Sequence, residues 1–96
     1  MSPLKRKKLN KIRSELDKLD NSLIKLIKKR TNLVKKVLQL KENKNQIVDQ
    51  KRIKKILNNI KIKSLQNKID PKITNRIWKN MIWSYIDFER RNFKKK

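Results

Sequence analysis

The chain has 96 residues, enough for one small domain, and carries 30 Lys and Arg against 8 Asp and Glu, a formal net charge of +22. It contains no Cys, His or Gly, which excludes disulfides, thiolate or imidazole metal ligands, Cys or His catalysis and glycine-rich phosphate loops. No apolar run could span a membrane, and the opening MSPLKRKKLNK lacks the apolar core of a signal peptide. We therefore expect a cytoplasmic protein without a metal or cofactor.

The first predicted helix runs from Pro3 to about Asn43, because no Gly and no further Pro interrupts this stretch. One line of positions recurs in steps of three and four residues, which is typical of a helix that packs along a seam. All but one of these seam positions are apolar: Leu9, Ile12, Leu16, Leu19, Leu23, Leu26, Arg30, Leu33, Val37 and Leu40. A second stripe lies beside the seam and predicts packing on two flanks: Arg13, Asp20, Ile24, Ile27, Thr31, Val34, Leu38 and Lys41.

The length of this helix predicts a partner. About 40 residues in a helix extend roughly 60 Å, whereas a compact monomer of this size has a radius of gyration of only about 13 Å. The seam would be exposed in a monomer. A homodimer with intertwined long helices is the simplest way to cover it, and a helix docked on another protein is the alternative.

Two shorter helices follow. Residues 42–49 are polar and predict a loop, after which Asp49 is placed to cap a second helix that fades near residues 65–70. Asp70 and Pro71 then provide an N-cap and a proline at the first helical position of a third helix. The second helix carries the apolar stripe Ile53, Ile56, Leu57 and Ile60. The third carries Ile73, Ile77, Trp78, Met81, Ile82, Tyr85 and Ile86 and leads into a polar tail. We expect an all-α single domain over residues 1–96, with disordered basic tails at about 1–8 and 94–96.

Arg30 interrupts the seam, and a buried guanidinium must be paired because it cannot lose its proton. An interchain ion pair that sets the helix register would explain it. A pocket for an anionic ligand would explain it equally. Arg13, Lys41 and Arg52 also lie at or beside packing positions, and the chain has few acids to neutralise them. The set favours a small ligand with carboxylates or phosphates, held for a reaction that needs electrostatic stabilisation alone.

The high charge also suggests nucleic-acid binding. The basic residues are mostly lysines spread along the whole chain, and the few aromatic residues are not interleaved with them as base-stacking platforms. We favour a solvated basic surface and do not expect nucleic acid as a partner. A non-enzymatic basic helical dimer that binds nucleic acid remains an alternative.

The spacing of these residues resembles the all-helical class of chorismate mutases over nearly the whole chain. LNKIRSELDKLDNSLIKLIKKR, residues 9–30, is similar to the first-helix signature of the family, with Arg13, Asp20 and Arg30 at its polar positions. Lys41 follows at the family's spacing. VDQKRI resembles the Asp-x-x-Arg element, and IDPKITNRIWKNMIWSYIDFE resembles the closing helix that ends at Glu89.

The resemblance implies an intertwined homodimer that converts chorismate to prephenate in the shikimate pathway of aromatic amino-acid biosynthesis. Arg30 of one chain and Arg13 of the other would hold the two substrate carboxylates. Lys41 and Glu89 would contact the ether oxygen that gains charge as the C–O bond breaks. The resemblance further implies that Arg52 supports a carboxylate and that Asp49 lies near the ring hydroxyl.

Three positions depart from the family's pattern. Ile53 stands where Glu is frequent, Tyr85 where Ser is frequent, and Glu89 where Gln is frequent. Ile53 and Tyr85 resemble the isochorismate-pyruvate lyase branch of the same fold, which makes salicylate and pyruvate, although lyases carry Gln at the last position. We expect the mutase, with the lyase as the alternative. All three side chains are expected to line the substrate site.

Overall fold

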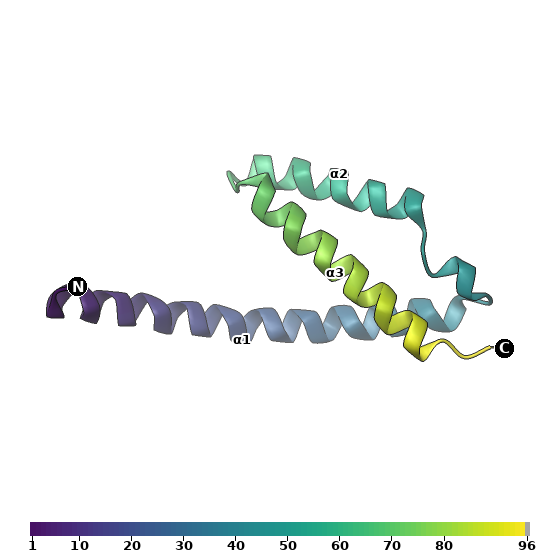
Figure 1. Cartoon of the computed structure of the whole chain (residues 1–96), viewed down its shortest axis with the longest axis horizontal. Coiled ribbons are helices and arrows are strands. Elements are labelled where there is room, and N and C mark those ends of the chain that lie inside the picture. The colour runs from purple at the N-terminus through teal and green to yellow at the C-terminus, as the bar shows by residue number, and fades with distance from the viewer. Residues whose placement is uncertain (96) are drawn as a thin grey trace. The chain divides into compact units, whose positions relative to one another are not determined.

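The computed structural model describes residues 1–95. Its elements are α1 (Pro3–Leu40), the short 3₁₀ helix η1 (Lys44–Gln46), α2 (Gln50–Gln66) and α3 (Pro71–Asn92) (Figure 1). No strand occurs among the described residues. The predicted all-α class with three helices is confirmed.

Local sequence signals fix the helix starts. The Asp49 carboxylate accepts a hydrogen bond from the Arg52 backbone N–H at 3.0 Å, and the Asp70 carboxylate accepts one from Lys72 N–H at 2.9 Å. Each acid satisfies a first-turn donor that has no partner within the helix. The predicted caps of α2 and α3 are therefore confirmed.

The N-terminal end of the chain is helical from Pro3, the start predicted for the first helix. Residues 3–8 therefore belong to α1. Ser2 explains this start, because its hydroxyl accepts from Lys5 N–H at 3.2 Å and its carbonyl accepts from Arg6 N–H at 2.9 Å. At the other end, Lys94 and Lys95 follow α3 without regular structure, and Lys96 lies outside the described residues.

The chain forms two compact units, Met1–Leu33 and Val34–Lys96. The N-terminal unit is the first part of α1 and contains no buried residue. Its seam and second stripe are largely exposed, with these apolar side chains at 46–65% exposure: Ile12, Leu16, Leu19, Leu23, Ile24, Leu26, Ile27 and Leu33. The apolar surface that the sequence assigns to packing is thus uncovered in the single chain.

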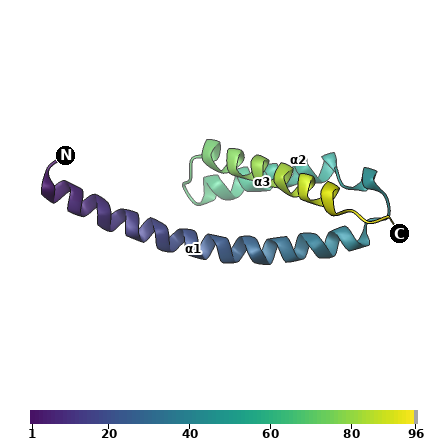
Figure 2. The same cartoon turned by 60° about the horizontal axis from the view of Figure 1, so that its bottom comes forward.

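The C-terminal unit consists of the end of α1, η1 and an antiparallel pair formed by α2 and α3 (Figure 1). A second view shows the two helices of the pair against each other (Figure 2). The buried core of the C-terminal unit is Ile47, Ile82 and Ile86. Partly buried apolar side chains pack around this core: Leu38, Val48, Ile53, Ile56, Leu57 and Phe93. In this part of α1, Leu38 faces the core, whereas the seam residues Val37 and Leu40 remain exposed. Within the C-terminal unit, the seam positions of α1 therefore face away from the core.

The turn between α2 and α3 holds a residue in the left-handed region. Lys68 has a φ of 56°, Lys68 N–H donates to Leu65 O, and Ile69 N–H donates to Ser64 O. This pattern is the Schellman ending of a helix, in which glycine is the usual left-handed residue. A chain without glycine places lysine there and accepts its steric cost.

Candidate functional site

Lys41 and Glu89 meet in the C-terminal unit. Lys41 Nζ lies 2.9 Å from Glu89 Oε1 and donates a hydrogen bond to it. The two residues are 48 positions apart in the chain. The structure thus joins two residues for which the family resemblance implies contact with the same atom of the substrate.

Periodicity explains why both side chains point inward. Glu89 follows Ile82 and Ile86 by seven and three residues, so all three lie on the buried face of α3. Lys41 follows Leu38 by three residues directly after the end of α1, and Lys41 N–H donates to Leu38 O at 3.1 Å. That bond tightens the last turn and keeps Lys41 on the side of the helix that Leu38 presents to the core.

Burial makes each charge of this ion pair dependent on the other for stability. Glu89 is only 5% exposed, and the side chain of Lys41 is 19% exposed. A buried carboxylate is stable only with a hydrogen-bonded counter-charge, which the ammonium supplies. The ammonium has three N–H donors and uses one on Glu89, so it retains donors for a ligand.

Asp49 and Arg52 lie at the start of α2, and both are exposed. Their spacing has a local structural cause, because the Asp49 carboxylate caps the Arg52 amide. The cap sets the first turn of α2 and thereby fixes where the Arg52 side chain leaves the helix.

Ile53 and Tyr85 are both partly buried. Ile53 packs against the core of Ile47, Ile82 and Ile86, which an acidic residue could not do without a partner. Tyr85 lies on α3 one turn before Glu89. The departure from the family's pattern at Ile53 thus coincides with an apolar environment of that side chain.

Arg13 and Arg30 lie on the N-terminal unit, where Arg13 is exposed and Arg30 is partly buried. Seventeen residues separate them along one continuous helix, which corresponds to about 25 Å along the helix axis. A single chain therefore cannot bring both guanidinium groups to one small ligand.

Ile47 is the residue of this region that sequence reasoning missed. It lies in the stretch 42–49 that was predicted as a polar loop, yet it is 3% exposed and belongs to the core. Gln46 helps to fold this segment, since its side-chain oxygen accepts from the Glu42 and Asn43 backbone amides. The only signal was the apolar pair Ile47-Val48 inside a polar run.

Among residues 1–95, no group of three or more Asp or Glu side chains is arranged to hold a metal ion. No helix in the same range is long and apolar enough to cross a membrane.

Comparison with known proteins identifies the family. The model of the family chorismate mutase type II matches residues 12–90, which is well over half of the chain. No curated protein and no solved structure gives a significant match. The matched range includes every candidate site residue named above, from Arg13 to Glu89. The chain therefore belongs to the chorismate mutase type II family.

Proposed function

We propose that the protein is a chorismate mutase, an isomerase that converts chorismate to prephenate by an intramolecular Claisen rearrangement. The observation that carries this proposal is the buried Lys41–Glu89 pair in a chain of the chorismate mutase type II family. The rearrangement needs no proton transfer and no covalent intermediate. A chain without His or Cys can support it by holding the substrate and stabilising charge.

Lys41 and Glu89 act on the ether oxygen in this proposal. Negative charge builds on that oxygen as the C–O bond breaks, and a preorganised ammonium in a site of low dielectric stabilises it. Lys41 is held in place by Glu89 and retains N–H donors for this contact. Glu89 can donate a hydrogen bond to the oxygen only when its carboxyl group is protonated.

Arginines hold the two substrate carboxylates. Arg30 of one chain and Arg13 of its partner each bind one carboxylate, since the planar guanidinium matches a carboxylate with two parallel hydrogen bonds. Arg52 supports a carboxylate and Asp49 lies near the ring hydroxyl. Ile53 and Tyr85 line the remaining wall of the site.

A homodimer follows from this assignment. Arg13 and Arg30 of one chain are too far apart for one ligand, so a second chain must contribute one of them. The exposed seam of α1 supplies the apolar surface for that contact. Both observations support two shared active sites related by two-fold symmetry. Residues 1–96 then act as one domain of a cytoplasmic enzyme of aromatic amino-acid biosynthesis.

Mixing two inactive variants tests the shared site. Arg13→Ala and Arg30→Ala chains, refolded together in equal amounts, give hybrid dimers with one doubly substituted site and one intact site. Random pairing restores about a quarter of the wild-type activity. If each active site is built from a single chain, the mixture stays as inactive as its components.

Isochorismate-pyruvate lyase is the second candidate, and Ile53 favours it. The side chain at this position packs against the core instead of presenting a carboxylate to the substrate hydroxyl. Lyases of this fold share an apolar residue there and a Tyr at the position of Tyr85. The same electrostatic site could support the elimination of pyruvate from isochorismate.

A product assay distinguishes the candidates. The purified protein is given chorismate and isochorismate separately, at neutral and at acidic pH, and the products are separated by chromatography. Prephenate from chorismate supports the mutase. Salicylate and pyruvate from isochorismate alone would replace the mutase with the lyase. Failure to form either product would refute both proposals.

A further inference from the structure

The segment between α1 and α2 connects two parts of the proposed active site. Lys41 directly follows the end of α1, whereas Asp49 and Arg52 belong to the start of α2. Residues 42–48 are the whole covalent connection between these groups, and they are polar as far as Gln46. The separation of the Lys41 ammonium from the Arg52 guanidinium therefore depends on how this segment is folded.

The side chain of Gln46 closes the segment into a turn. Its Oε1 accepts hydrogen bonds from the backbone N–H groups of Glu42 at 2.6 Å and of Asn43 at 3.0 Å. Both lone pairs of this oxygen are thus used, on the first two amides after Lys41. The Gln46 backbone N–H also donates to Asn43 O at 3.1 Å. One residue consequently determines the path of the chain as it leaves α1.

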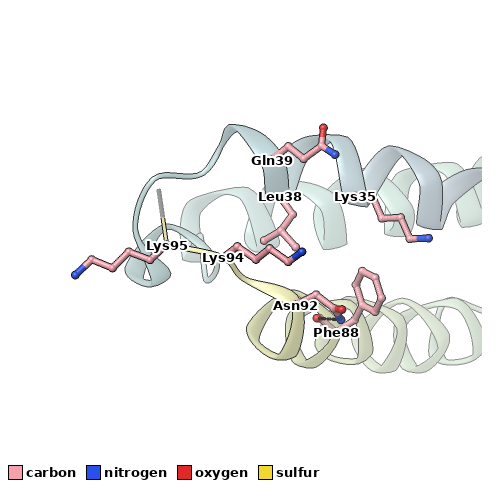
Figure 3. Close-up of a pocket in the computed structure, with 7 residues that line it drawn as sticks. All are labelled: Lys35, Leu38, Gln39, Phe88, Asn92, Lys94 and Lys95. Atoms are coloured by element: carbon pink, nitrogen blue, oxygen red, sulfur yellow. Dashed lines mark hydrogen bonds between the residues drawn. The ribbon is translucent and has the colours of Figure 1, made fainter.

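Both sides of this turn are anchored in the C-terminal unit. Before the turn, Leu38 lines the pocket between the ends of α1 and α3 and points toward Phe88 (Figure 3). The Leu38 carbonyl accepts the backbone N–H of Lys41. After the turn, Ile47 is 3% exposed and belongs to the core. Gln46 therefore bridges two fixed points, and Lys41 lies between them.

We propose that Gln46 is a positioning residue of the active site, which holds Lys41 and Arg52 at their working separation before the substrate binds. This inference rests on the proposed function, in which Lys41 contacts the ether oxygen and Arg52 supports a carboxylate. A substrate that meets a preformed site spends no binding free energy on ordering the segment. Gln46 acts through the backbone of residues 42 and 43 and does not itself contact the substrate.

Two substitutions separate the acceptor oxygen from the bulk of the side chain. Gln46→Met keeps the length of the side chain and removes the oxygen, whereas Gln46→Glu keeps an oxygen that accepts both amides. Hydrogen exchange of the Glu42 and Asn43 amides, followed by NMR on the full chain, should be faster in Gln46→Met by about 10-fold. Gln46→Glu should exchange like the wild type. Gln66→Met is the matched control at an exposed position of α2 and should also leave these two amides unchanged.

Steady-state kinetics provide the readout of positioning. Gln46→Met should raise KM for chorismate by up to about 10-fold and leave kcat unchanged, because the substrate must select the molecules whose segment is folded. Gln46→Glu and Gln66→Met should keep the KM of the wild type. All assays are run well below the unfolding temperatures of the variants, which thermal unfolding measures.

A purely structural role of Gln46 predicts a different result. It would lower the unfolding temperature of Gln46→Met and leave KM unchanged, and this outcome would overturn the proposal. An equal rise of KM in Gln46→Glu, or a fall of kcat at unchanged KM, would also overturn it. If the wild type forms neither prephenate nor the lyase products, the proposed function fails, and the exchange rates of the two amides still decide whether Gln46 holds the segment.

Discussion

Lys41 Nζ donates a hydrogen bond to Glu89 Oε1 at 2.9 Å, and this contact joins the end of α1 to the end of α3. The carboxylate is buried and the ammonium is its counter-charge. The pair therefore has a structural cost, because a buried charge must be neutralised, and a chemical use, because both groups are proposed to contact the substrate. Substitutions at the two positions separate the cost from the use.

Glu89→Gln tests the chemical use. The amide keeps the shape of the side chain and adds an N–H donor that an ionised carboxylate lacks. We expect higher activity than the wild type at neutral pH, by up to about 10²–10³-fold in kcat, the worth of one well-placed donor. Steady-state kinetics with chorismate measure it. An unchanged or lower kcat in Glu89→Gln would contradict the need for a hydrogen-bond donor at this position.

Lys41→Ala tests the structural cost. Loss of the ammonium leaves the buried Glu89 carboxylate without a counter-charge, which destabilises the fold by about 3 kcal/mol. The double variant Lys41→Ala/Glu89→Ala should recover part of this loss, since it removes the orphan charge as well. Urea denaturation followed by circular dichroism gives the free energies of unfolding. No recovery in the double variant would mean that the two charges are not coupled.

Arg30→Leu distinguishes an active-site arginine from one that only sets helix register. In a purely structural dimer, an apolar residue at this seam position should stabilise the protein. In the proposed enzyme, activity should fall by about 10²-fold or more, whatever the change in stability. Lys29→Leu is the matched control at the neighbouring exposed position and should remain active. Full activity of Arg30→Leu would remove Arg30 from the site.

Lys68→Gly tests the turn between α2 and α3. Glycine adopts the left-handed conformation without the steric cost that Lys68 bears at a φ of 56°, so the variant should be more stable by about 1 kcal/mol. Lys61→Gly, in an exposed helical position of α2, should instead lose about 0.5–1 kcal/mol. Thermal unfolding of both variants provides the comparison, and a loss at both positions would rule out relief of strain at Lys68.

Ser64→Ala tests the polar contact between α2 and α3. Ser64 is 3% exposed, and its hydroxyl lies 2.6 Å from both Ile60 O and Thr74 Oγ1. Its removal leaves the Thr74 hydroxyl with a poorer partner and should cost about 1–3 kcal/mol. A double-mutant cycle with Thr74→Val measures the coupling, and strictly additive losses would show that the two hydroxyls do not interact.

Local signals were sufficient for the three α-helices of this fold. Asp49 before α2 and Asp70-Pro71 before α3 predicted the helix starts, because a cap acts on amides only two or three residues away. The seam of α1 predicted an amphipathic helix, because the spacing of its apolar residues depends only on neighbouring turns of the same helix. The resemblance to the family then connected Arg13, Arg30, Lys41 and Glu89 to one chemistry. That assignment stays a prediction, whereas the match over residues 12–90 shows the family itself.

The tertiary structure decided what depends on distant parts of the chain. The burial of Ile47 could not be predicted from a polar stretch, because it depends on the surface that α3 offers with Ile82 and Ile86. The left-handed Lys68 follows from closing the α2–α3 pair rather than from any preference of lysine. The direct pairing of Lys41 with Glu89 likewise depends on the tertiary structure. Sequence periodicity placed each side chain on an inward face, and only the packing of two helix ends brought the charges into contact, where burial obliges them to pair.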